Sequence, residues 1–198
     1  MEKTRCGWAV GFEPAIRYHD EEWGVPRHDD AGQFEFLVLE SAQAGLSWNT
    51  ILKKREGYRR CFAGFDAEQV ARFTERDVER LLKDAAIVRN RKKIKSAIGN
   101  ARVFLDIAAK HGSFSRWLWD FVDGRPVRNA WRNMREVPAS TRLSDTVARE
   151  MKKLGFTFMG SVIVYAHMQA TGMVNDHLLS CFRHEEVAAL ALPTSSPE

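Results

Sequence analysis

A histidine and a cysteine lie four residues apart in the segment VNDHLLSC, residues 174–181. If this segment is a helix capped by its asparagine or aspartate, His177 and Cys181 project from one face and can bind the same ion. Structural zinc takes four ligands, and the N-terminal region supplies another cysteine and histidine, Cys6 and His19. These residues predict a zinc site joining the two ends of the chain, although an unrelated pair of buried side chains would show the same spacing.

The composition describes a chain that can bury its own core. It has 198 residues, of which 44% are hydrophobic, which suits one domain or two closely packed helical lobes over residues 1–187. No apolar run approaches the ~20 residues that span a bilayer, and the N-terminus lacks a signal-peptide pattern, so we expect a cytoplasmic protein without membrane contact and take it to be a monomer. Three widely spaced cysteines argue against a disulfide framework.

Positive charge is clustered although the net charge is only +4. Basic residues crowd into KKREGYRR at 53–60 and RNRKKIK at 89–95. Either cluster can bind a polyanion, and either can equally be the solvated face of a helix. The composition alone therefore leaves a nucleic-acid partner open.

Helix signals dominate the rest of the chain and position these residues. Segment 161–170, SVIVYAHMQA, is rich in β-branched residues, but no second strand is available to pair with it, so we assign it as a buried helix. An apolar stripe at helical spacing runs over 94–108 and ends before Gly112. We predict an all-α fold with a disordered tail over 188–198. The predicted helix starts are Asp29 or Asp30, Ser47, Asp66, Thr74, Ser113 and Ser144.

Four segments together resemble the DNA-3-methyladenine glycosylase I family. They are RCGW at 5–8, YHDEEWGVP at 18–26, LESAQAGLSWNTILKKREGYRRCF at 39–62, and VNDHLLSC at 174–181. The resemblance implies a helix-hairpin-helix DNA glycosylase fold, with its terminal segments joined by one structural Zn²⁺. It also implies an activity in base excision repair: hydrolysis of the N-glycosidic bond of 3-methyladenine in alkylated double-stranded DNA, leaving an abasic site. The family's zinc ligands fall on the same two cysteines and two histidines.

The resemblance also implies a pocket for a base flipped out of the DNA stack. Tyr18, Glu40 and Trp48 would line it, with Glu40 as the catalytic carboxylate, while Trp8 and Trp23 either bind the base or belong to the core. Without the resemblance, Glu40 would be read as a solvent-exposed residue at the rim of its helix. Because 3-methyladenine in DNA is already cationic, it is a good leaving group and needs little more than selection and modest electrostatic help. No lysine is among the residues that would line this pocket, so we expect plain hydrolysis by water, without a Schiff base or strand cleavage.

DNA contacts are expected from a hairpin and from the turn before Trp48. The hairpin resembles LLKDAAIVRNRKKI at 81–94, where Ala86 replaces the glycine that is usual in the family. Its backbone amides would approach phosphates, and Leu46 would fill the space left by the flipped base; the alternative for Leu46 is a buried leucine in a helix–helix turn. The expected DNA-binding residues are Gly45, Leu46, Lys53, Lys54, Arg55, Arg89, Arg91, Lys92 and Lys93.

Two other functions remain open at the level of the sequence. A zinc-stapled helical module could bind DNA without catalysis, which the basic segments would also fit. A glycosylase for a different lesion would keep the fold and change the pocket. A carboxylate beside stacked aromatic rings favours the enzyme, because a protein that only binds DNA has no need of one.

Overall fold

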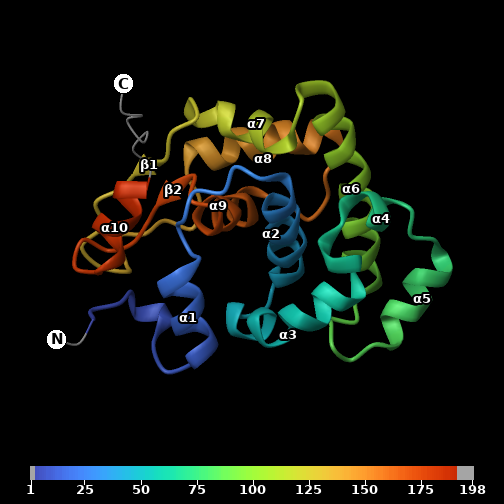
Figure 1. The fold of residues 1–198 in the computed structure, drawn as a ribbon, viewed down its shortest axis with the longest axis horizontal. Coiled ribbons are helices and arrows are strands. Elements are labelled where there is room, and N and C mark those ends of the chain that lie inside the picture. The colour runs from blue at the N-terminus through green and yellow to red at the C-terminus, as the bar shows by residue number, and fades with distance from the viewer. Residues whose placement is uncertain (1–2, 191–198) are drawn as a thin grey trace, which may run out of the picture.

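The computed structural model describes residues 3–190, which are almost entirely helical (Figure 1). A two-residue parallel pairing of β1 with β2 is the only sheet within that range. The elements in order are η1 (Gly7–Ala9), α1 (Glu13–Glu21), α2 (Asp30–Gln43), α3 (Trp48–Cys61), η2 (Ala63–Phe65), α4 (Ala67–Ala71), α5 (Glu75–Lys83), α6 (Arg91–His111), α7 (Phe114–Trp119), η3 (Asp120–Val122), β1 (Val127–Arg128), α8 (Arg142–Leu154), α9 (Ser161–Ala170), β2 (Val174–Asn175) and α10 (Arg183–Leu190).

Most predicted helix starts are confirmed, and side-chain caps explain them. Asp29 accepts the Gly32 amide at the start of α2, and the Ser47 hydroxyl accepts the Thr50 amide at the start of α3. The predicted stripe lies on α6, which ends at Gly112 with φ of 87°. Segment 161–170 is helix α9, as predicted. Local capping chemistry therefore fixes where these helices begin.

Three local predictions were wrong. Helix α8 begins at Arg142, because Thr141 and Ser144 cap each other reciprocally one turn before the predicted start. Segment 176–182 is a turn and not a helix, and the next helix, α10, begins only at Arg183. The predicted disordered tail is also partly wrong, since residues 188–190 belong to α10, while 191–198 lie outside the described residues.

Helices α2 and α9 pack together at the centre of the molecule, and α8 packs against α9 (Figure 1). Phe34 and Leu37 of α2 and Val164 and Met168 of α9 are buried in the main apolar core. A second, smaller apolar cluster gathers residues of η1, α1 and the segment after β2. The N-terminal segment and α10 lie on the same side of the molecule (Figure 1), so the second cluster joins the two ends of the described chain.

Among residues 3–190, no helix combines the length and apolar character needed to cross a bilayer. The one long helix, α6, carries a basic first turn and an amphipathic surface. Its length serves packing against α4, α5 and α7.

Candidate functional site

A cavity of about 350 Å³ opens between the N-terminal helices and α9. All the residues predicted for base binding line it: Tyr18 from α1, Glu40 from α2, Trp48 from the first turn of α3, and Trp8 and Trp23 beside them. The volume is in the range of pockets that take one small molecule. The remaining lining residues are Gln43, Met134, Val137, Pro138, Ala139, Val162, Tyr165, Ala166, Gln169 and Asp176.

Aromatic rings dominate one wall of this pocket. The Tyr18 and Trp48 ring centroids are 5.2 Å apart with their planes at 50°, and Trp8 meets Trp23 edge-on at 5.0 Å. Such rings offer planar apolar surface, and an electron-rich indole also attracts a cation. The wall therefore suits a flat ligand, and favours one that carries positive charge.

Three polar atoms of the pocket residues have no hydrogen-bond partner among the described residues. They are the Tyr18 hydroxyl, Oε2 of Glu40 and Nε1 of Trp48, each buried. Buried polar groups are nearly always paired, and an unpaired one costs about 1–3 kcal/mol. Three such atoms in a single pocket indicate a site built for a ligand with its own donors and acceptors.

Burial perturbs both ionisable groups in this trio. It raises the pKa of Glu40 to about 8, so the carboxyl of the free protein is protonated at neutral pH. Burial, reinforced by the neighbouring Glu40, also raises the pKa of Tyr18. A carboxyl with a pKa near neutrality can be either donor or acceptor, according to the charge of its partner.

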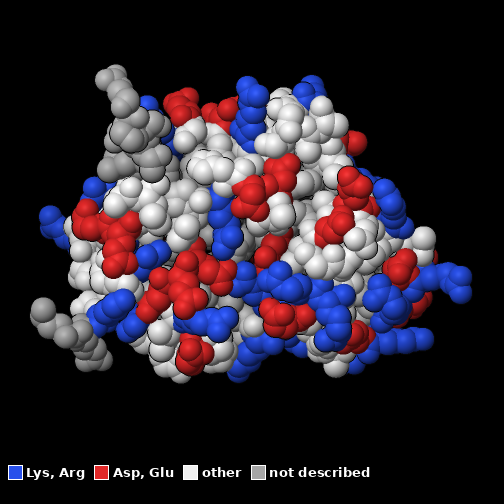
Figure 2. Space-filling view, in the orientation of Figure 1, with Lys and Arg blue, Asp and Glu red and all other residues white. Residues whose placement is uncertain are grey.

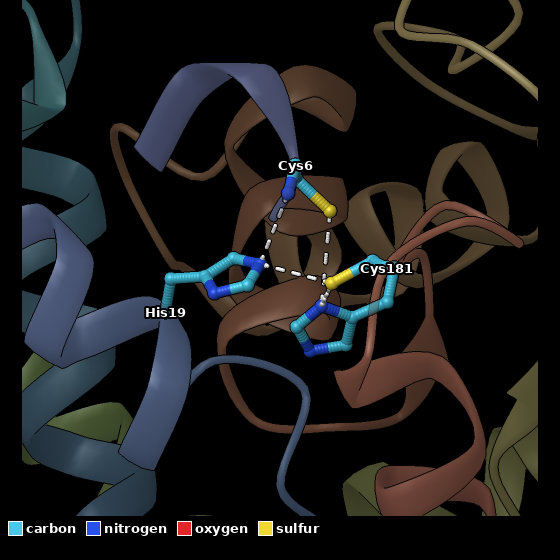
Figure 3. Close-up of side chains that lie close together, drawn as sticks. Cys6, His19 and Cys181 are labelled. Carbon is cyan, nitrogen blue, oxygen red and sulfur yellow. Dashed lines mark hydrogen bonds between the residues drawn. The ribbon is translucent and has the colours of Figure 1, made fainter. Parts of the chain in front are cut away.

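The predicted metal ligands come together at the junction of the chain ends. The ligand atoms of Cys6, His19, His177 and Cys181 are all buried and lie within 4.8 Å of one another. Figure 3 shows three of these side chains pointing toward one another. Sγ of Cys181 lies 3.4 Å from Nε2 of His19 and 3.6 Å from Nδ1 of His177, and Sγ of Cys6 lies 3.8 Å from the same Nδ1.

These three sulfur–nitrogen distances are close to the edge of a tetrahedron around one ion. Typical zinc–sulfur and zinc–nitrogen bonds place ligand sulfur and nitrogen atoms about 3.6 Å apart. The outer ring nitrogens are also held: Nδ1 of His19 is 2.8 Å from the Asp20 carboxylate, and Nε2 of His177 is 3.0 Å from the Trp23 carbonyl. Each imidazole is thereby fixed in the tautomer that turns a lone pair inward. The two cysteines and two histidines of this cluster suit a divalent metal ion that binds sulfur and imidazole nitrogen.

The predicted DNA-contacting residues divide into available and engaged groups. Gly45, with φ of +77°, and Leu46, 40% exposed, form the turn between α2 and α3 beside the pocket. Arg89 and Lys92 are exposed, and the exposed Lys53 has its ammonium 5.1 Å from the centre of the Phe12 ring. These side chains are free to meet a phosphate.

Several other basic residues have partners within the protein, so their part in DNA binding stays a prediction. The Lys93 ammonium donates to the carbonyls of Ala42 and Ala44 at 2.8 and 2.6 Å, at the end of α2. The remaining engaged residues are Lys54, which bonds the Ala85 carbonyl; Arg55, which pairs with Glu22 and Glu35; and Arg91, which pairs with Glu75 and Glu79. Figure 2 accordingly shows acidic side chains among the basic ones over α3, α5 and the turn before α6.

The predicted role of backbone amides in hairpin 81–94 stays a prediction, and several of these amides are bonded within the protein. The Ala86 amide bonds the Asp84 carboxylate, and the Val88 amide bonds the Tyr58 hydroxyl. The amides of Lys92 and Lys93 bond the Asn90 side chain that caps α6. With these amides satisfied inside the protein, this turn offers few donors for a phosphate.

The other residues that line the pocket could not be predicted from the sequence. Tyr165 and Gln169 come from α9, where an apolar helical pattern conceals them, and Met134 and Val137 come from an irregular segment without periodicity. Asp176 lies inside the VNDHLLSC segment, next to the predicted metal ligand His177. Only the burial and the hydrogen bonds of Asp176 in the structure identify it as a pocket residue.

The fold and the pocket together define a helical protein whose aromatic cavity suits one flat, polar ligand and lies beside a candidate metal centre. Residues 8–184 match the family model for methyladenine glycosylase. The chain is 48% identical over 177 residues to DNA-3-methyladenine glycosylase 1 of Escherichia coli strain K12, covering 89% of this chain and 95% of that relative. It is 40% identical to DNA-3-methyladenine glycosylase of Haemophilus influenzae, covering 90% and 96%.

Solved structures agree with these relatives. A crystal structure of 3-methyladenine DNA glycosylase I superposes with a TM-score of 0.88 at 47% identity, covering 90% of this chain and 98% of that one. A variant of such an enzyme in complex with 3-methyladenine gives 0.87 at 35% identity, covering 90% and 96%. The chain therefore belongs to the methyladenine glycosylase family. It is an enzyme, a DNA glycosylase that hydrolyses N-glycosyl bonds.

Proposed function

We propose that the enzyme removes 3-methyladenine from alkylated double-stranded DNA by holding the flipped base in the aromatic pocket. The observation that carries this proposal is the trio of unpaired buried atoms on Tyr18, Glu40 and Trp48. A methylated adenine has both ring acceptors and an exocyclic amine to satisfy such groups. The two relatives named for this activity and the complex with 3-methyladenine support the choice of base.

Glu40 is proposed as the catalytic carboxylate. Glu40 is 3% exposed, and burial accounts for its raised pKa without an opposing cation among the described residues. A cationic base would favour ionised Glu40, which would then accept a hydrogen bond from the base edge and stabilise positive charge as the bond to the sugar breaks. Because the lesion is already a good leaving group, one such interaction is sufficient help.

The reaction is proposed to be monofunctional. Among the described residues, no lysine lines the pocket, so no amine is in place to form a Schiff base with the sugar. The sugar would instead be attacked by water, which leaves an abasic site and an intact strand.

For the metal centre we propose one structural Zn²⁺ held by Cys6, His19, His177 and Cys181. The ligand set suits zinc, and its four protein ligands leave no open position for substrate. The ion would tie the N-terminal segment to the turn after β2, and so hold together the part of the fold that carries Trp8 and Trp23. This chain's residues bind and orient the base without passing chemistry through the metal.

DNA would lie across the mouth of the pocket. Leu46 at the exposed α2–α3 turn is proposed as the wedge, and Lys53, Arg89 and Lys92 as outer phosphate contacts. Phosphate contacts of this kind add affinity without sequence preference, which suits a search for lesions.

We assign the hairpin role to α8, the turn at 155–160 and α9, in place of residues 81–94. Among residues 3–190, no side chain caps the N-terminus of α9, so its first amides are available to a phosphate, and α9 itself lines the pocket. Arg149 and Lys152 border the adjoining surface cavity of about 620 Å³. A helix-hairpin-helix placed here would anchor the strand next to the flipped base.

Incubation with methylated duplex DNA, followed by chromatography of the released bases, tests the function. We expect free 3-methyladenine, intact strands before alkaline treatment, and much slower release by Glu40→Gln. Borohydride should trap no covalent protein–DNA adduct. Failure of the folded, zinc-loaded protein to release any base would favour the module that binds DNA without catalysis, and release of another base would favour a different lesion.

A further inference from the structure

Asp176 is a buried carboxylate in the pocket wall that the proposed chemistry does not use. It is 2% exposed, lines the same pocket as the aromatic rings, and directly precedes the candidate metal ligand His177. Oδ1 accepts hydrogen bonds from Asn129 at 2.6 Å and Trp131 at 2.9 Å. Oδ2 accepts from the Tyr165 hydroxyl at 2.6 Å and Gln169 at 2.8 Å.

These four donors define the charge state of the group. An amide nitrogen and an indole N–H can only donate, so both Asp176 oxygens must accept, which is the pattern of a carboxylate without a proton. None of the four partners carries a positive charge, and among the described residues no lysine or arginine is ion-paired with Asp176. A Zn²⁺ held by two cysteine thiolates and two neutral histidines would add no net charge beside it, so the pocket wall holds a negative charge that neutral dipoles stabilise and do not cancel.

The same arrangement prevents Asp176 from acting as a general base or a direct partner of the base edge. Each oxygen already accepts two hydrogen bonds from side chains that are themselves held in the fold. What remains for a ligand in the pocket is the electrostatic potential of the charge. In a partly desolvated cavity that potential is large, because water does not screen it fully.

We propose that Asp176 is a specificity-determining residue whose fixed negative charge selects purines that carry a positive charge. The inference rests on the proposed function, because it concerns the same pocket, and it assigns the selection to a residue other than Glu40. Normal adenine and guanine are neutral and would gain nothing from this charge. An N-alkylated, cationic purine would gain a favourable interaction at every point of the pocket.

Two non-cleavable probes of nearly the same shape test the proposal. One is the cation 3,9-dimethyladeninium, in which a methyl group replaces the sugar, and the other is its neutral analogue with carbon in place of N3. Calorimetric titration gives a dissociation constant for each. The wild-type protein should bind the cation more tightly, and Asp176→Asn should reduce that preference by roughly 10- to 100-fold while leaving the neutral probe within about twofold.

A second variant separates charge from structure. Asn129 lies behind the carboxylate and outside the pocket lining, so Asn129→Lys would place an ammonium against Asp176 and neutralise it without removing the acceptor. This variant should also lose the preference for the cation, whereas the matched control Asn129→Gln should keep it. Zinc content and thermal unfolding, measured for each variant, show that the metal centre beside residue 176 is intact.

The outcomes separate a failure of the charge selection by Asp176 from a failure of the pocket assignment. An unchanged preference in folded Asn129→Lys, or an equal loss for both probes in Asp176→Asn, would mean that Asp176 only holds the wall in place and would overturn the proposal. If the wild-type protein bound neither probe, the pocket assignment itself would fail. If it bound both probes equally, the pocket would stand and the charge selection would not.

Discussion

Replacing Glu40 by glutamine should stabilise the protein, and by an amount that grows with pH. Burial raises the pKa of Glu40 from 4.5 to about 8. The folded protein thus prefers the protonated carboxyl, so the group's contribution to stability is full below about pH 4.5 and is lost as the pH rises through about 8. Glutamine has the same shape and never ionises, so the variant avoids this loss.

The size of the effect follows from the shift. Each pKa unit corresponds to about 1.4 kcal/mol, so between pH 5 and pH 8 the wild-type protein should lose about 3 kcal/mol relative to Glu40→Gln. For a chain of this length that is a difference in melting temperature on the order of 6–12 °C. Chemical unfolding at pH 5, 6, 7 and 8 measures it directly.

The matched control is Glu56→Gln, since Glu56 lies on α3 with a side chain that is 83% exposed. Its substitution should show no growing difference with pH. A stability gain for Glu40→Gln that stays constant from pH 5 to pH 8 would refute the reasoning, because it would mean that the carboxyl is already ionised in the free pocket. The affinity of the wild-type protein for a cationic base should meanwhile rise with pH up to about 8, since protons compete with the cation for Glu40.

Three further predictions concern the metal centre and the DNA face. Cys181→Ser should remove the zinc and lower the melting temperature by about 10 °C or more, with a smaller effect on the rate per folded molecule; full stability with lost activity would instead indicate a catalytic metal. Leu46→Ala should weaken binding to lesion-containing DNA about tenfold, yet change the unfolding free energy by less than about 0.5 kcal/mol because the side chain is 40% exposed; equal losses would return Leu46 to the core. Lys152→Ala should reduce the slope of log affinity against log salt by about one, whereas Lys93→Ala should act mainly on stability; the reverse pattern would restore the hairpin at 81–94.

Local chemistry explains why much of the helical framework could be predicted from the sequence. A capping side chain needs only its near neighbours, so Asp29 and Ser47 act in the fold as their sequence context suggests. The metal ligands could be predicted for a related reason, because cysteine and histidine are few and their chemistry is specific.

Features that depend on distant contacts could not be predicted in the same way. A spacing of four residues is compatible with a helix and with a tight turn. The turn forms at His177 and Cys181 because the preceding Asp176 is held in the pocket wall by four hydrogen-bond donors. The hydrogen-bond partners of a lysine cannot be predicted from its neighbours in sequence either, since Lys93 donates to carbonyls about fifty positions earlier in the chain.

The pocket assignment is the central claim, and a variant that fills the cavity tests it most directly. Ala166 lines the pocket from α9, whereas Ala109 is an exposed residue of α6 outside it. Free 3-methyladenine should bind the wild-type protein at one base per chain, and should bind Ala109→Trp equally well. Ala166→Trp, folded and zinc-loaded, should neither bind the base nor release it from methylated DNA. Undiminished release of 3-methyladenine by Ala166→Trp would contradict the account, because excision would then take place outside this pocket.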